Sequence, residues 1–271
     1  MMDTRELIKI IARPKLNEPN LIAAWPGVSS VALIIASYLL EKLPFKDLAE
    51  IKPMYFFEPI GVLARNNIVE APSFPQSRFF YYKNSTGPND LILFIGDAQP
   101  ASKAYDMANA ILDLGSRFRM SRVYTCAAAM TRMHHTEQPS VRGVATNPAM
   151  AEKLERLNLN RGGNLQISGL NGLLLGVAKE RNIDGICLLG DVPSYSHRIQ
   201  NPMAALAVLD KLKPMLGIEL DTADLAEVAK ETQQRIKEFA AEAMEDYIDY
   251  FTEPIWEQGE EYYDDEEDEE D

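Results

Sequence analysis

Short uncharged apolar runs alternate with helical patterns along most of the chain. Each run has four to six residues, and most are followed directly by turn-forming residues such as Pro26-Gly27 or Gly190-Asp191. Strands that are apolar at every position are typical of a sheet buried on both faces by helices. The runs that we interpret as such strands are Leu21–Trp25, Leu91–Ile95, Val123–Ala128 and Ile186–Leu189.

Helices are predicted between these runs, because apolar positions recur there three or four residues apart. Pro202, next to Asn201, fits the first turn of one of them. The helices that we expect are Val31–Glu41, Ser102–Arg119, Leu173–Arg181 after the small-residue turn 168–172, and one that begins after Asn201-Pro202.

Other short runs have no helix between them, so the sheet does not consist of strand–helix–strand units alone. Asn66-Asn67 separates two of these runs and fits a hairpin turn, since asparagine tolerates positive φ. We therefore expect an α/β fold with a mixed sheet and helices on both faces, in one domain. The additional strand candidates are Met54–Phe57, Ile60–Ala64, Ile68–Ala71, Arg78–Lys83, Val141–Thr146 and Leu165–Ser168.

The pattern changes between Thr222 and Phe251, where a long helix without Pro or Gly is predicted. Its apolar stripe is thin, because Thr and Ala occupy core positions. The helix either packs on its own domain or also pairs with another subunit, as weak stripes often need a partner to be buried. The stripe is Leu225, Ala229, Thr232, Ile236, Phe239 and Ala243.

Charge separates a near-neutral body from an acidic end. The 271 residues include 27 Lys and Arg against 41 Asp and Glu, a formal net charge of −14. Eleven of the acidic residues lie in 257–271, which has no basic residue, so the rest carries 27 − 30 = −3. Without a basic excess, nucleic-acid binding is not expected as a main function. We expect a 1–220 α/β domain, a 221–252 helix and a disordered acidic tail at 253–271.

No membrane segment is expected. Leu21–Leu40 is uncharged and long enough to span a bilayer, but Pro26-Gly27 and Ser29-Ser30 interrupt it, which favours a strand and a buried helix. Cys126 and Cys187 lie in apolar runs without metal-binding spacing, which indicates buried thiols in a reducing compartment. Together with an N-terminus that lacks a signal peptide, this predicts a cytoplasmic protein.

Polar residues and glycines gather directly after the predicted strands. In an open α/β sheet, ligands bind outside the carboxyl ends of the strands. We therefore expect a ligand or partner pocket at this edge, and neither a metal nor a cofactor in it. The candidate residues are Gly27, Glu58, Asp97, Gln99, Asn171, Asp191, Tyr195 and Asn201.

Several of these features also have a structural interpretation. Gly-Asp after a strand is common as a turn whose carboxylate caps the next helix, which accounts for Asp97 and Asp191 without a ligand. The turn Gly27–Ser30 can bind an anion through backbone N–H groups, or its serines can cap a helix. The adjacent His134 and His135 cannot both point at one metal ion as an i, i+4 pair would.

Catalytic patterns are absent from the sequence. Ser194, Ser196 and His197 have the residue types of a triad but no G-x-S-x-G elbow. Neither G-x-G-x-x-G nor G-x-x-x-x-G-K-[ST] occurs. The residues do not identify an enzyme.

Several short motifs at these same loops resemble, in order and spacing, those of the proteasome assembly chaperone family, over roughly residues 20–215. The most specific is Gly190–Tyr195, followed by Asn201–Ala205 at a helix start. The others are Ala24–Gly27, Phe57–Pro59 and Ile167–Leu174.

The resemblance implies a three-layer αβα sandwich like that of nucleoside phosphorylases, with self-assembly into homo-oligomers. It further implies a binding role toward proteasome subunits or other proteins rather than a reaction. The chain departs from the family at one point. Members that dock on the proteasome ring often end in a hydrophobic residue, Tyr and any residue, whereas residues 268–271 are Asp-Glu-Glu-Asp, which argues against docking by that route.

Two hypotheses follow. The preferred one is a non-enzymatic, oligomeric protein-binding or assembly-chaperone-like protein. The alternative is a protein that binds nucleoside- or nucleotide-like small molecules, or a hydrolase, with its site in the strand-end pocket.

Overall fold

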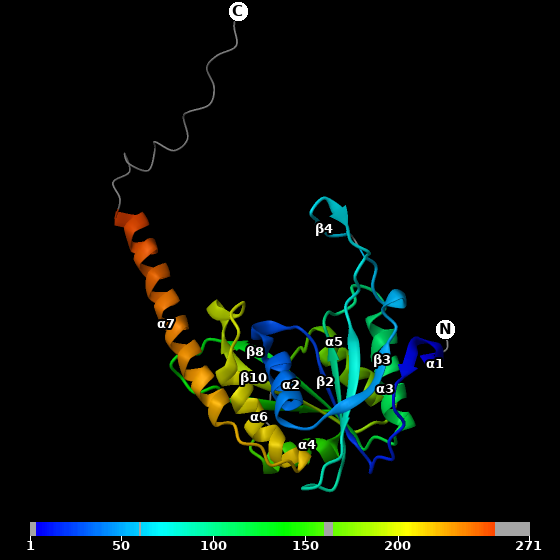
Figure 1. Ribbon diagram of the computed structural model, residues 1–271. Helices are drawn as coiled ribbons and strands as arrows, with labels where there is room; N and C mark the ends of the chain where they lie inside the picture. The colour runs from blue at the N-terminus through cyan, green and yellow to red at the C-terminus, as the bar shows by residue number, and fades with distance from the viewer. Residues whose placement is uncertain (1–3, 60, 160–164, 253–271) are drawn as a thin grey trace, which may run out of the picture.

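A mixed sheet forms the centre of the molecule (Figure 1). The computed structural model describes residues 4–59, 61–159 and 165–252, and within these ranges the sheet has eight strands. In chain order they are β1 Ile8–Ile10, β2 Asn20–Ala24, β3 Lys46–Ile51, β6 Ser77–Tyr82, β7 Leu91–Gly96, β8 Arg122–Thr131, β9 Val141–Ala145 and β10 Gly185–Pro193. Across the sheet the order is β1-β3-β6-β7-β2-β8-β10-β9.

The four central strands are the apolar ones. β7, β2, β8 and β10 run parallel, and in their register Ile22 lies opposite Leu93 and Tyr124. Antiparallel strands complete both sides, with β6, β3 and β1 next to β7, and β9 next to β10. The predicted mixed sheet is therefore confirmed.

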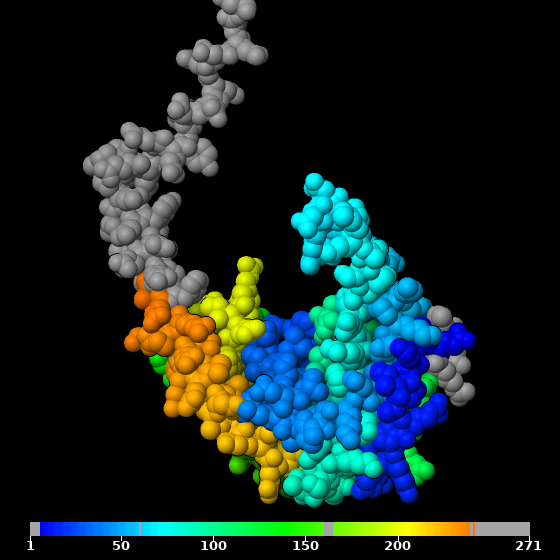
Figure 2. Space-filling model, viewed as in Figure 1, coloured from blue at the N-terminus to red at the C-terminus, as the bar shows by residue number. Residues whose placement is uncertain are grey.

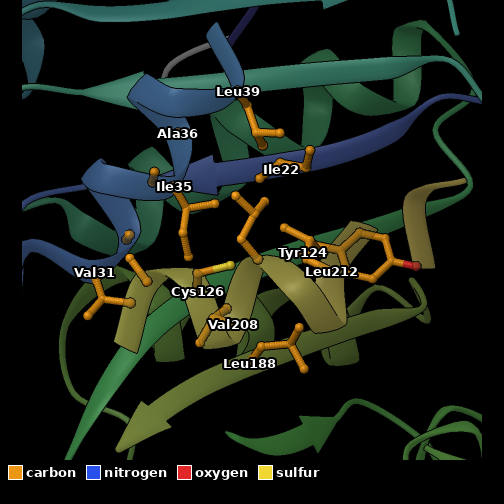
Figure 3. Close-up of a cluster of buried hydrophobic side chains, with 14 of the residues drawn as sticks. Ile22, Val31, Ile35, Ala36, Leu39, Tyr124, Cys126, Leu188, Val208 and Leu212 are labelled. Carbon is orange, nitrogen blue, oxygen red and sulfur yellow. The ribbon is translucent and has the colours of Figure 1, made fainter. Parts of the chain in front are cut away.

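Helices cover both faces of the sheet, which gives the expected α/β layers (Figure 1). α2 (Val31–Lys42) and α6 (Pro202–Leu216) pack on one face, where Ile22, Cys126 and Leu188 point toward them (Figure 3). α3 (Ala104–Arg117) and α5 (Gly169–Glu180) pack on the other face. There, the rings of Trp25 and Phe79 contact Phe94, with centroids 5.2 and 4.8 Å apart.

The remaining body helices are short. α1 (Thr4–Leu7) precedes β1, and α4 (Pro148–Arg156) packs beside β9. The single turns η1 (Val28–Ser30), η2 (Pro53–Tyr55) and η3 (Ser194–Ser196) are 3₁₀ helices.

The long C-terminal helix is confirmed as α7, Ala223–Thr252. Leu225, Ala229 and Ile236 of the predicted stripe are buried, and α7 packs on α6. The side chains of Phe239 and Ala243, and the predicted tail 253–271, lie outside the described part of the chain. At 1.5 Å per residue, thirty residues span about 45 Å, and Figure 1 shows α7 continuing past the body.

A second projection is the hairpin of β4 (Ala64–Arg65) and β5 (Ile68–Val69). Asn66 and Asn67 have φ of 50° and 63°, the positive values that a type I′ turn requires, so the predicted turn is confirmed. We call residues 61–73 the arm. All thirteen are exposed, and the arm stands clear of the body in Figures 1 and 2.

Some predicted elements are wrong. Met54–Phe57 is not a strand, because Phe56 and Phe57 donate their N–H groups to Pro53 O and close a 3₁₀ turn. Leu165–Ser168 forms no ladder with a strand, and the described part of Ile60–Ala64 joins the hairpin only at Ala64. α5 begins at Gly169, so Asn171 and Gly172 belong to the helix and not to a turn before it.

No helix within the described ranges is both long and apolar enough to cross a membrane. The uncharged segment Leu21–Leu40 instead contains β2, a turn and most of α2. Cys126 and Cys187 are both free and buried, as predicted.

Candidate functional site

A cavity of about 480 Å³ opens at the carboxyl ends of β2 and β8. Ala127, Ala128 and Ala129 of β8 and Leu189 of β10 line one wall, and the loop 165–168 with Gly169 at the start of α5 lines another. Three consecutive alanines add only methyl groups at the end of β8, so space remains between this strand and the loop. The cavity lies where an open α/β sheet binds ligands.

Gln99 connects two walls of this cavity. Its Nε2 donates to Pro26 O at 2.8 Å, and its Oε1 accepts from the N–H of Leu170 at 2.9 Å. The side chain therefore ties the turn after β2 to the first turn of α5. Gly169 permits this contact, since a Cβ at that position would lie 2.7 Å from Gln99 Oε1.

Asn171 presents an unpaired polar group beside the cavity. It lines the cavity and is only 5 % exposed, and its Oδ1 has no hydrogen-bond partner in the described part of the chain. Its backbone O accepts from Thr125 Oγ1 at 3.4 Å, which fixes α5 to β8. Buried polar atoms in native structures are normally paired, so this oxygen needs an explanation.

Arg142 brings a positive charge to the cavity wall. It lies on β9 opposite Leu189, and its Nε is 3.0 Å from Asp191 Oδ1. The two atoms are close but not aligned for a hydrogen bond, so the contact is ionic. The Asp191 side chain is only 10 % exposed, whereas that of Arg142 is 33 % exposed.

The structure brings together half of the predicted site residues. Gly27, Gln99 and Asn171 line the cavity. Asp191 does not line it but forms an ion pair with Arg142, which does. Asp191 lies inside β10, so it does not cap the next helix.

The other four predicted residues lie elsewhere. Asp97 is exposed, and both its Oδ2 and its N–H bond to the backbone of Gln76, a structural role. Asn201 caps α6, since its Oδ1 accepts from the N–H of Ala204 at 2.9 Å. Glu58 is exposed just before the arm. Tyr195 is 53 % exposed and contacts His135.

Tyr195 belongs to a second polar cluster, next to α7. Its Oη accepts from the N–H of His135 at 2.9 Å and lies 2.9 Å from the Nδ1 of the same residue. Gln233 of α7 donates from Nε2 to His135 O at 3.0 Å. Burial, with His134 and Lys237 nearby, lowers the pKa of His135. The cluster fixes α7 to the loop after β8.

Arg142 and the alanines of β8 were not among the predicted site residues. The signal for Arg142 was a single basic residue in the otherwise uncharged run Val141–Thr146. Its position became informative only once β9 was placed antiparallel to β10, which brings Arg142 to the carboxyl end of that strand.

A family model matches most of the chain. Residues 21–240 match the model of the PAC2 family. The chain belongs to the PAC2 family. This confirms the resemblance to the proteasome assembly chaperone family, and the match includes the cavity, the arm and the first half of α7.

Individual proteins are similar to this chain over most of its length. The uncharacterized protein MJ1210 of Methanocaldococcus jannaschii is 28 % identical over 252 residues, 88 % of this chain and 92 % of that protein. The crystal structure of Pyrococcus furiosus PbaB, an archaeal proteasome activator, has a TM-score of 0.72 at 29 % identity and covers 86 % of this chain and 98 % of its own. P. furiosus PbaA, a homologue of proteasome-assembly chaperones, has a TM-score of 0.65 at 20 % identity, with 89 % and 99 % covered.

Proposed function

We propose that this PAC2 protein is a non-enzymatic binding protein that self-assembles and holds other proteins during assembly, with proteasome subunits as the partner class. The observation that carries the proposal is the exposed apolar arm. Val62, Leu63, Ile68 and Val69 are 52–71 % exposed.

The arm has little to stabilise it within one molecule. A two-stranded hairpin is at best marginally stable on its own in water, and clustered exposed apolar side chains mark interaction sites. Its single ion pair within the described residues, Arg65 Nε to Glu70 Oε1 at 3.0 Å, is largely exposed and stabilises the hairpin little. Contact with another protein would bury the apolar side chains and order the hairpin.

Proteasome subunits are proposed as partners because of the PAC2 membership and the similarity to PbaB. Location in the cytoplasm, where such subunits are found, remains a prediction. The acidic residues 257–271 favour a partner surface that is basic, through long-range attraction.

Self-assembly is tested by native mass spectrometry of the full chain and of an arm variant. Val62→Ser, Leu63→Ser, Ile68→Ser and Val69→Ser together should shift the protein toward monomer and leave its circular dichroism spectrum unchanged, since these exposed side chains contribute nothing to the core. Leu157→Ser, at an exposed position just after α4 and away from both the arm and α7, is the matched control. A wild-type monomer at micromolar concentration would contradict self-assembly.

Partner binding is tested separately by capture from the native source. Wild-type protein should retain proteasome subunits, and the arm variant should retain fewer of them. If the wild-type protein forms its oligomer but neither it nor the arm variant captures proteasome subunits, the partner assignment is overturned and self-assembly stands.

A further inference from the structure

We propose that the cavity at the carboxyl ends of β2 and β8 binds a small organic anion. Arg142 and the first turn of α5 would hold its carboxylate or phosphate group, and the alanines of β8 would contact its apolar part. This site is separate from the arm and does not depend on self-assembly.

Charge selects an anion. Arg142 is the only charged residue among the described residues that line the cavity. Its guanidinium has five N–H donors and stays protonated. Asp191, its only ion-pair partner within the described ranges, approaches Nε and does not line the cavity itself. The remaining donors of Arg142 are therefore available to a ligand.

The start of α5 adds donors of the same kind. Ser168 and Gly169 line the cavity, and the Ser168 side chain forms no capping hydrogen bond. The N–H of Leu170 is already bonded to Gln99, but the other N–H groups of the first turn have no partner within the helix. The helix dipole makes this end favourable for negative charge.

Asn171 gives an independent indication of a ligand. Asn171 lines the cavity and is only 5 % exposed, and its Oδ1 has no partner among the described residues, a state that a bound molecule with a hydroxyl or N–H group would relieve. We therefore expect the ligand to carry a donor as well as its anionic group.

The rest of the cavity suits a compact apolar group. Ala127–Ala129, Ile167 and Leu189 contribute only hydrocarbon. The volume of about 480 Å³ lies within the range of about 300–1,000 Å³ of small-molecule pockets.

Isothermal titration calorimetry on the full chain tests the proposal with paired probes. 4-Hydroxybenzoate and 4-hydroxyphenyl phosphate carry the two anionic groups on one ring together with a hydroxyl donor, and 4-hydroxybenzamide and hydroquinone are their neutral counterparts. At least one anion should bind saturably and both neutral compounds should not. The anion that binds more tightly distinguishes a carboxylate site from a phosphate site. Comparison with inorganic phosphate shows how much affinity the ring adds.

Variants assign the binding to this cavity. Asp191→Asn removes the neighbouring negative charge and should bind the anion more tightly than wild type. The Arg142→Gln, Asp191→Asn double variant should bind it at least about tenfold more weakly than wild type. If the pair of Arg142 and Asp191 were purely structural, the single and the double variant would not change the anion affinity in opposite directions. Arg156→Gln, an exposed arginine on α4, is the control and should bind as wild type.

A second variant removes the space without changing charge. Ala127→Leu should abolish binding of the anion and leave the circular dichroism spectrum unchanged. The proposal is overturned if neither anion binds at about 10 mM, a Kd beyond the range of a specific site. It is also overturned if the neutral probes bind equally, or if the Arg142→Gln, Asp191→Asn double variant binds like wild type.

Discussion

Gly169 is required by both its backbone conformation and the space beside it. Its φ is +72°, and a Cβ would lie 2.7 Å from Gln99 Oε1. Gly169→Ala should therefore destabilise the protein by about 1–2 kcal/mol in urea unfolding. A Cβ added at Gly176 in the same helix would have no neighbouring atom within 4 Å, so Gly176→Ala should instead stabilise the protein by about 0.5–1 kcal/mol. Equal effects would contradict this account.

The two cysteines should be inert in the native state. Burial raises the pKa of the Cys187 thiol to about 11, and burial with Cys187 nearby raises the pKa of Cys126 as well. The thiolate is the reactive form, so a thiol reagent at about pH 8 should label neither residue in native protein. Both should react after denaturation. Rapid labelling of either residue in the native protein would show that it is accessible.

Single residues differ in how far their roles follow from sequence. Gln99 and Asn171 were found because they closely follow predicted strands or turns, and both line the cavity. Asp97 follows the same rule, yet it bonds to Gln76, which comes from a loop 21 residues away. Arg142 was missed because its place depends on which strand β9 pairs with. Sequence position identifies a strand end, but tertiary pairing decides which side chains meet there.

The start of α7 is fixed to α2 by charge. Asp224 contacts Lys42 and the Tyr38 hydroxyl, and the hydrogen bonds from Lys42 and Tyr38 lower the pKa of Asp224 from 3.8 to about 2. A carboxyl whose pKa is lowered in the folded state contributes its full stabilisation of the fold above its unfolded-state pKa. This stabilisation is lost as the pH falls through the folded-state pKa.

Asp224→Asn should therefore lower the thermal midpoint near neutral pH, and the difference from wild type should shrink between about pH 4 and pH 2. Circular dichroism melts across this range measure it. Asp210→Asn removes a half-exposed i, i+3 partner of Lys213 and should have a small effect throughout. A difference that persists unchanged at pH 2 would assign the effect of Asp224→Asn to something other than charge.

Whole elements were predicted best where local signals agree with burial. The central strands are mostly apolar, and asparagine tolerates the positive φ that a type I′ hairpin turn requires, so both were found. β3 was missed because Lys46, Asp47 and Glu50 interrupt its apolar pattern and a bulge lies between Asp47 and Ala49. Met54–Phe57 was assigned as a strand because its apolar residues were counted without the effect of Pro53, whose carbonyl accepts the turn bonds.

At the scale of the molecule, the proposed binding features gather at one edge of the sheet. The cavity lies at the carboxyl ends of β2 and β8, and Tyr195 follows β10. The arm leads into Ser77 of β6, which lies opposite Gly96 at the carboxyl end of β7. Figure 1 shows the arm and the end of α7 projecting in the same general direction. Partners and ligands of the proposed sites would therefore approach this edge.

The acidic residues 257–271 should act on association rather than on folding. Removing them changes the net charge from −14 to −14 + 11 = −3, while the described body keeps all its contacts. The thermal midpoint should therefore stay the same. If these residues attract a basic partner surface, the truncated chain should capture less proteasome protein at about 50 mM salt, because screening is weak there. At about 0.5 M salt, where charges are screened within a few ångströms, both chains should capture equal amounts. If the two chains capture equal amounts at low salt, residues 257–271 contribute to solubility and not to partner binding.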